Sequence, residues 1–345
     1  MKTVVLGEVE LPSGIMVVLD PGLSRFWCHD ASPDSPLANA PPMHDLEIVG
    51  PDAAAAAQKY DRQFDPRYLL DIPDVDGVVA HFATLCREHG FDARVVVAAQ
   101  RISHLQRAHS ALAAGDGIGI VQYNGLWGVV VGRLPTGRRL PVVGYEMDDD
   151  EFAGRFRAIE IIADAAAAVA HSRTIQGVMV DYGELMCVGL EPLGAFRMWH
   201  SLDGLADFVF RGRDAAALAA DVDARALDDD WFGWRDLPMA DVARHAAPLQ
   251  ERIKREQLAV SVDYRPHDNL ERLNAQVRCA PERSGVIRLD GVAACGFDNR
   301  WGDGIFDVIA DYDAAGSVVR VRLDVGSEPM QTRLRELRSG VSSSG

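Results

Sequence analysis

The stretch IFDVIADYDAAGSVVRVRLDV, residues 305–325, decides how this chain folds. Its two arms, Ile305 to Tyr312 and Val318 to Val325, are rich in the Val, Ile and aromatic residues that favour strands. Between the arms, Asp313-Ala314-Ala315-Gly316 supplies turn residues, so the stretch predicts a β-hairpin. An antiparallel sheet is therefore expected, and other β-prone runs are candidates to join it.

Such runs occur near both ends of the chain and in its middle. Val4 to Val9 and Ile15 to Leu19 flank Pro12-Ser13-Gly14 and predict a second hairpin. Asn124-Gly125, inside the β-rich residues 117–145, is a strong hairpin signal. A lone hairpin is marginal in water, so we expect the N- and C-terminal β segments to pack in one unit.

Apolar residues at helical spacing predict helices over residues 74–89, 102–115 and 239–256, with an Ala/Asp-rich helical region over 203–227. Phe152, Phe156, Ile159 and Ala163 also share a helical face, and the acidic run 148–151 precedes them. Carboxylates there favour the positive end of a helix dipole. Contiguous acids lack the spacing of an EF-hand loop, so capping is preferred and no metal is assigned.

The chain is thus expected to be α+β, with β-rich N- and C-terminal segments sharing a core with a helix-rich middle. Whether the two long regions form separate domains stays open. The expected organisation is an N-terminal β segment and Pro-rich loop (1–50), an α+β middle region (51–172), an α+β C-terminal region with terminal β-hairpins (173–338) and a mobile tail (339–345).

Charge and composition restrict the possible partners. The 345 residues hold 35 Lys and Arg against 51 Asp and Glu, a net charge of −16, with no extended basic run, which disfavours nucleic acid as a partner. No stretch reaches the roughly 18 apolar residues of a membrane span, and no signal peptide opens the chain, so a cytoplasmic location is expected. The acidity favours either simple solubility or a basic protein partner.

Nucleotide, zinc and hydrolase signatures are absent from the sequence. The five cysteines never occur as C-x-x-C, and no Gly-rich phosphate loop, H-E-x-x-H or G-x-S-x-G is present. We therefore expect no cofactor and no metal.

Carboxylates at strand ends are the candidate catalytic residues. If they converged in a cleft, burial and mutual repulsion would split their pKa values and allow general acid and base roles. Asp before Pro or Gly also suits a turn, because its side chain bonds the backbone two residues on, and this role is preferred. The candidates are Asp20, Asp181, Glu184 and Asp303.

A second candidate site is an acidic and aromatic segment that we expect to be a loop. Exposed aromatic side chains anchor many protein interfaces, although tryptophan is more often buried. The partner-binding candidates are Asp228, Asp229, Asp230, Trp231 and Trp234.

A possible internal repeat relates Gly115-Asp116-Gly117-Ile118 to Gly302-Asp303-Gly304-Ile305. Both precede a short strand, a Tyr-Asn or Tyr-Asp turn and a Val-rich strand. A duplicated β unit would produce this pattern, and so would common turn chemistry.

Three segments resemble an uncharacterised family of bacterial proteins, known only as a domain of unknown function. They are Leu11-Pro12-Ser13-Gly14 with Asp20-Pro21, Val180 to Met186, and Trp301 to Val308 with Asp313 and Gly316. The resemblance implies a β-rich core with the three motifs near one another. It carries no activity and no catalytic residue.

The sequence is consistent with two classes of function. The first is an acidic cytoplasmic protein-binding protein, such as an immunity protein or antitoxin that masks a basic toxin. The second is a hydrolase that uses the four strand-end carboxylates. The sequence leaves the oligomeric state open.

Overall fold

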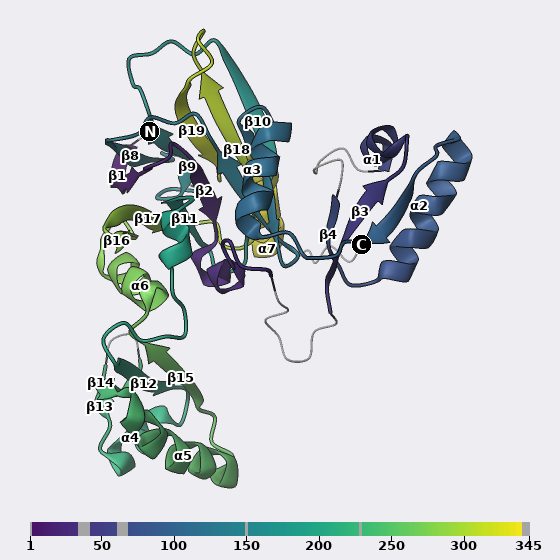
Figure 1. Cartoon of the computed structure of the whole chain (residues 1–345). Coiled ribbons are helices and arrows are strands. Elements are labelled where there is room, and N and C mark those ends of the chain that lie inside the picture. The colour runs from purple at the N-terminus through teal and green to yellow at the C-terminus, as the bar shows by residue number, and fades with distance from the viewer. Residues whose placement is uncertain (1, 34–41, 61–67, 149–150, 228–229, 340–345) are drawn as a thin grey trace. The chain divides into compact units, whose positions relative to one another are not determined.

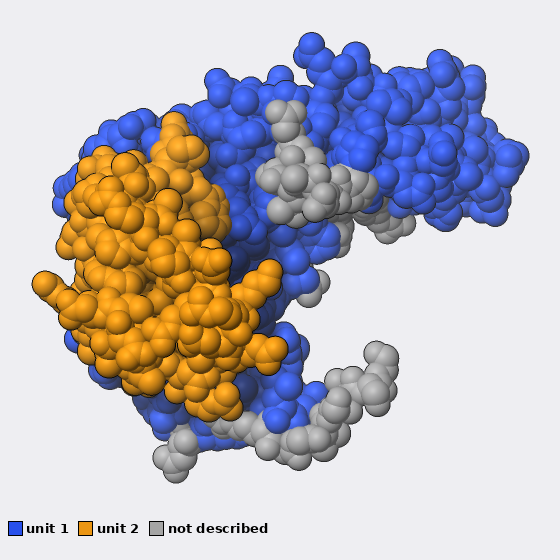
Figure 2. Space-filling model, turned by 90° about the horizontal axis from the view of Figure 1, so that it is seen from below, with its two compact units in different colours: residues 1–195, 276–345 blue, residues 196–275 orange. Residues whose placement is uncertain are grey.

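The computed structural model describes residues 2–33, 42–60, 68–148, 151–227 and 230–339 (Figure 1). It confirms an α+β fold with β-rich termini. The chain forms two compact units, unit 1 (residues 1–195 and 276–345) and unit 2 (residues 196–275), coloured separately in Figure 2. The unit boundaries fall at 196 and 275, within the region that the sequence groups as 173–338. Most of the Pro-rich loop (34–41) and nearly all of the predicted tail (340–345) lie outside the described residues.

Unit 1 is built on two antiparallel six-stranded sheets. Sheet A has the strand order β1-β8-β9-β19-β18-β10, and sheet B has the order β16-β17-β11-β2-β7-β6. The strands of sheet A are β1 (Lys2–Glu10), β8 (Arg139–Glu146), β9 (Phe156–Ile162), β10 (His171–Val180), β18 (Gly304–Tyr312) and β19 (Val318–Asp324). The strands of sheet B are β2 (Met16–Leu19), β6 (Ile118–Tyr123), β7 (Leu126–Val131), β11 (Glu184–Gly189), β16 (Ser284–Leu289) and β17 (Val292–Asp298).

Apolar side chains from both sheets form one buried core. Val9 and Val142 come from sheet A, and Val18 and Val131 come from sheet B. The edge strands of sheet A lie close to sheet B, since β1 contacts β16 and β17 and β10 contacts β6 and β7. The terminal β segments therefore pack in one unit, as the sequence predicts.

A glycine makes each of these close approaches possible. A Cβ atom on Gly7, in β1, would lie 2.7 Å from Cγ2 of Val286 and 2.9 Å from Sγ of Cys295. A Cβ atom on Gly177, in β10, would lie 2.8 Å from Cδ1 of Ile120. Both glycines sit where the strand register shifts, so a bulge accompanies each approach.

The connectivity of the first half of the chain recurs in the second half. The first half runs β1, β2, the 3-10 helix η1 (Pro21–Phe26), an α/β module, α3 (His104–Ala114) and β6 to β9. The second half runs β10, β11, η2 (Pro192–Ala195), an α/β module, α6 (Asn269–Cys279) and β16 to β19. Each sheet therefore contains three strands from one half of the chain, followed in reverse order by the three corresponding strands of the other half. The halves pair through β2 with β11 and through β9 with β19.

The two modules also share their topology. The first module (residues 44–97) contains β3 (His44–Val49), α1 (Ala53–Tyr60), β4 (Tyr68–Ile72), α2 (Val75–His89) and β5 (Arg94–Val97), with strand order β4-β3-β5. The second module (residues 205–266) contains β12 (Leu205–Arg211), α4 (Ala215–Val222), β13 (Arg225–Ala226), β14 (Phe232–Pro238), α5 (Met239–Glu256) and β15 (Ser261–Pro266), with strand order β13-β14-β12-β15. In each module the helices pack on the sheet around a separate apolar core. The chain's last described helix is α7 (Glu328–Ser339).

Several local predictions need correction. β1 and β2 form no hairpin, because β1 joins sheet A and β2 joins sheet B. The helix predicted from Phe152 to Ala163 is wrong, since Phe156–Ile162 is strand β9, paired with β8 and β19. The acidic run before it, of which residues 149 and 150 are outside the described residues, therefore caps no helix. The residues predicted as a loop up to 234 enter strand β14 at Phe232.

The internal repeat suggested by the two Gly-Asp-Gly segments is misaligned. Those segments precede β6 and β18, which occupy different places in the repeated connectivity. β6 corresponds to β16, at the edges of sheet B, and β18 corresponds to β8, within sheet A. The similarity between the two segments is therefore shared turn chemistry, while the repeat itself lies in the order of the elements.

No helix in the described part of the chain is long and apolar enough to cross a membrane.

Candidate functional site

Asp20 is a buried link between two turns. It precedes η1, is fully buried, and accepts backbone N–H groups from Gly22 at 2.7 Å and from Asp181 and Tyr182 at 2.8 Å each. Burial raises the pKa of its carboxyl to about 6, although these three hydrogen bonds oppose the shift. The carboxylate holds backbone and has no open side for a substrate.

The second half supplies a counterpart to this link. Glu191 precedes η2, and its Oε2 accepts the hydroxyl of Ser13 at 2.6 Å. Asp20 thus holds the turn between β10 and β11, while Glu191 holds the turn between β1 and β2. Asp20-Pro21 and Glu191-Pro192 therefore each form hydrogen bonds from one half of the chain to the other.

The other three strand-end carboxylates do not assemble with Asp20 into a cluster. Asp181 and Asp303 are exposed, and Glu184 is half-buried in β11. Their turns are neighbours, because Asn299 N–H donates to the carbonyl of Gly183 at 3.0 Å and the carbonyl of Gly302 accepts the Asn299 side chain at 2.9 Å. The segments around Asp20, Asp181 and Asp303 therefore lie near one another. Within the described residues, however, none of the four carboxylates joins a group of three ligand-type side chains with donor atoms within 4.8 Å.

The acidic and aromatic segment, residues 228–234, belongs to unit 2. Asp228 and Asp229 lie outside the described residues, and Asp230 is exposed with φ of 61°. Two guanidinium groups contact the ring of Trp231, that of Arg211 at 4.7 Å and that of Arg265 at 4.3 Å from the ring centroid.

Trp234 has a different position from Trp231. It lies on β14, packs against the core of unit 2, stacks on Phe208 and contacts the tilted ring of His245. Trp234 therefore belongs to the fold, whereas Asp230 and Trp231 remain candidates for partner contact.

A buried ion cluster closes the first module against α3. The Arg107 guanidinium donates to Asp45 at 2.9 Å and to Asp71 at 2.8 Å, and Arg101 also donates to Asp71. The side chains of Asp45 and Asp71 are fully buried, and that of Arg107 is 2 % exposed. Asp71 further accepts the N–H of Gly125 at 3.0 Å.

This cluster balances its own charge. Burial alone would raise the pKa of Asp71, but Arg107 and the other partners outweigh it and the net shift is downward. Two carboxylates face two guanidinium groups, so the cluster needs no further ion. Its role is to hold the module in place.

The second module contains the same pair of aspartates. Asp236 N–H donates to Oδ1 of Asp207 at 2.9 Å, just as Asp71 N–H donates to Oδ1 of Asp45 at 3.1 Å. Asp236 and Asp71 also share a left-handed backbone, with φ of 56° and 54°. Asp207 and Asp45 lie on corresponding strands, β12 and β3, and Asp236 and Asp71 lie on corresponding strands, β14 and β4.

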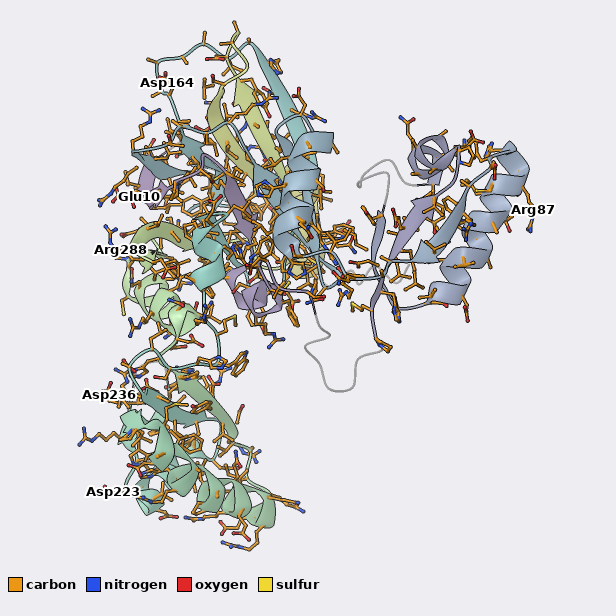
Figure 3. All side chains as sticks on the ribbon, viewed as in Figure 1. Glu10, Arg87, Asp164, Asp223, Asp236 and Arg288 are labelled. Atoms are coloured by element: carbon orange, nitrogen blue, oxygen red, sulfur yellow. The ribbon has the colours of Figure 1, made fainter. Side chains whose placement is uncertain are left out.

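His267, directly after β15, faces this second pair. Its Nε2 lies 3.2 Å from Oδ1 of Asp207 and 3.9 Å from Oδ1 of Asp236, and its Nδ1 lies 3.1 Å from Oδ2 of Asp203. Figure 3 labels Asp236, whose side chain is 73 % exposed. Nε2 and one oxygen from each of Asp207 and Asp236 all lie within 4.8 Å of one another. These three side chains could hold a metal ion.

The local charges shift the pKa values of this group. Burial lowers the pKa of His267, but the hydrogen bonds with Asp207 and Asp203 outweigh it and the net shift is upward. The backbone N–H of Leu205, with His267 and Ser201, lowers the pKa of Asp203 to about 2. Asp203 is therefore a fixed anion beside the imidazole.

Sequence reasoning missed the His267 group. Asp207 lies on β12, Asp236 lies on β14 and His267 follows β15, so no short-range spacing marks the three residues. The available signal was the correspondence of Asp207 and Asp236 with Asp45 and Asp71, which requires the two halves to be aligned by their order of elements.

No family model, curated protein or solved structure matches the chain.

Proposed function

We propose that this protein is a binding protein whose acidic surface recognises a basic protein partner, as an immunity protein or antitoxin would. The observation that carries the proposal is that both compact units are acidic. Residues 196–275 hold 11 Lys and Arg against 15 Asp and Glu, which gives 11 − 15 = −4. The rest of the chain then carries −16 + 4 = −12.

The placement of the strand-end carboxylates supports binding over hydrolysis. Asp20 is committed to three backbone N–H groups, and Asp181 and Asp303 are exposed in turns. General acid and base catalysis needs carboxylates that reach one substrate atom together. Surface carboxylates spread over two units instead create a long-range field that attracts a positively charged partner.

The test measures association rates with the basic protein that the full chain captures from cells. Raising the salt from about 20 to 150 mM should slow association by roughly tenfold, because the field of exposed charges is screened within about a Debye length. An association rate that does not change with salt, or a captured partner that is itself acidic, would contradict the proposal.

A matched pair of variants locates the contact. D228N/D229N/D230N removes three acids from the segment before β14, and D221N/D223N/E251Q removes three acids elsewhere in the same unit. Asp223 and Asp230 are both exposed and both have left-handed backbone, which asparagine tolerates, and D221N removes only a surface ion pair with Arg252. If the segment touches the partner, the first set should also speed dissociation, whereas the second should change only association. Equal effects of the two sets would exclude this segment as the contact.

A further inference from the structure

We infer that Asp207, Asp236 and His267 of the second module form a binding site for a divalent transition-metal ion. The first module shows what this arrangement of two aspartates accommodates. There, Asp45 and Asp71 surround the guanidinium group of Arg107, with Arg101 beside it. The corresponding pair in the second module therefore has the geometry of a cation site.

The two arginines that contact the aspartate pair of the first module have one half-exposed counterpart in the second. Arg272 lies four residues after the helix-capping Asp268, as Arg107 lies four residues after the helix-capping Ser103. Arg272 pairs with Asp203 at 3.5 Å and is half-exposed. The three carboxylates of Asp203, Asp207 and Asp236 thus face one guanidinium and one imidazole, which leaves the group at −2 when the imidazole is neutral. A divalent ion brings it to neutrality.

The orientation of His267 matches that of a metal ligand. A ligating histidine commonly donates its other ring N–H to a carboxylate, which fixes the tautomer and aims the lone pair at the metal. Asp203 occupies this position at Nδ1 and is itself held by the N–H of Leu205 at 3.0 Å and the hydroxyl of Ser201 at 3.0 Å. The Nε2 atom then faces carboxylate oxygens, an arrangement that requires either a proton or a metal ion between them.

The distances fit one ion. Two ligands about 2.1 Å from a tetrahedral zinc ion lie about 3.4 Å apart. The separation between Nε2 and Oδ1 of Asp207 is 3.2 Å, and the separation between Nε2 and Oδ1 of Asp236 is 3.9 Å. A small rotation of the exposed Asp236 side chain is enough to bring its oxygen to the bonding distance.

The donor set indicates which ions suit the site. One imidazole with two carboxylates favours zinc or manganese over the softer ions that prefer thiolates, and over calcium, which takes six to eight oxygens. Three protein ligands leave at least one position for water. This resembles the open coordination of catalytic zinc sites more than the closed coordination of structural ones.

Calorimetric titration of the full chain with zinc chloride, in a buffer that does not chelate zinc, tests the inference. We expect one ion per chain with micromolar affinity. D236N and H267Q should each weaken zinc binding at least tenfold, and D203N should weaken it less, because Asp203 only positions the imidazole. H200Q removes an exposed histidine of the same unit and should bind zinc like the wild type.

Asp236 makes the test independent of folding, since its exposed side chain can change without disturbing the core. Unfolding curves without metal should confirm this for D236N. The site is absent if zinc does not bind, or if binding is the same in D236N, H267Q and the wild type. In that case a protonated imidazole, hydrogen-bonded to Asp203 and Asp207, accounts for the arrangement. Neither result bears on the acidic binding surface, which is tested by its own association rates.

Discussion

Single carboxylates in similar motifs have opposite roles in this protein. Asp20 and Asp181 both end strands before a turn, yet Asp20 is fully buried on three N–H groups and Asp181 is exposed. The sequence offers Asp-Pro-Gly in one case and Asp-Tyr-Gly in the other, and both are good turn formers. Only burial, which depends on the packing of the two halves, separates the structural carboxylate from the solvent-facing one.

Replacement by asparagine distinguishes these roles. D181N and D303N should each change the free energy of unfolding by less than about 0.5 kcal/mol, because both side chains are exposed. D20N should reduce it by about 1–3 kcal/mol, because an amide cannot accept all three buried N–H groups. Urea denaturation measures each value. A loss in D181N as large as that in D20N would show that the exposed carboxylate has an unrecognised role in the fold.

His104 makes the fold sensitive to acid. It is fully buried in α3, and its Nδ1 accepts the N–H of Cys28 at 3.0 Å. Burial lowers the pKa of its imidazole from 6.5 to about 3, so between these values the native protein binds fewer protons than the unfolded chain. Stability from this group is complete above pH 6.5 and falls as the pH falls.

Two variants on α3 isolate this contribution. Between pH 7.5 and pH 5 the wild type should lose about 2 kcal/mol of unfolding free energy that H104Q does not lose. H109Q changes an exposed histidine of the same helix and should keep the wild-type pH response. Urea titrations at the two pH values give these differences. Equal pH responses in H104Q and the wild type would contradict the assignment.

At the scale of elements, hairpins with local pairing could be predicted and strands with distant partners could not. Asn124-Gly125 joins β6 to β7, and Asp313 to Gly316 joins β18 to β19, as the turn residues indicate. β1 and β2 also flank a good turn, but each pairs with a strand more than 100 residues away. Turn chemistry is the same whether the flanking strands pair or separate into two sheets.

The same limit explains the incorrect helix. Phe152, Phe156, Ile159 and Ala163 fit a helical face, and all four are buried. Ile161, also buried, fits the strand β9 instead. Ile159, Ile161 and Ala163 alternate into the core, while Glu160 between them pairs with Arg320. A short apolar run can satisfy both periods, so periodicity alone does not separate this strand from a helix.

A glycine substitution tests the close approach of the edge strand β1. G7A should reduce the free energy of unfolding by about 3 kcal/mol or more, because the new Cβ meets Val286 and Cys295 and the backbone has φ of 154°. Gly137 is the control, with φ of 72° and open space around it, and G137A should cost about 1 kcal/mol. Thermal or urea unfolding measures both. Equal losses would mean that backbone conformation, and not the contact between sheets, sets the requirement for glycine at position 7.

At the scale of the molecule, the sequence predicts the fold class but hides the repeat. Corresponding elements differ in sequence, and two short Gly-Asp-Gly turns suggest a false alignment. The order of elements and the mirrored sheets reveal the true one. The His267 group is likewise hidden in the sequence, because only the aligned halves show that Asp207 and Asp236 correspond to Asp45 and Asp71.

The mirrored sheets make the two halves of the chain dependent on each other. A fragment ending after β9 would hold three strands of each sheet and would leave β2 and β9 without the partners that β11 and β19 provide. Its β1 would also lose the surface of β16 and β17 on which it packs. Each fragment would therefore expose bare strand edges and half a core, and would be prone to aggregate. The strand order is that of a symmetric dimer whose subunits have been joined into one polypeptide, and joining them allows the two copies to differ, with Arg101 and Arg107 beside the aspartate pair of the first module and His267 beside that of the second.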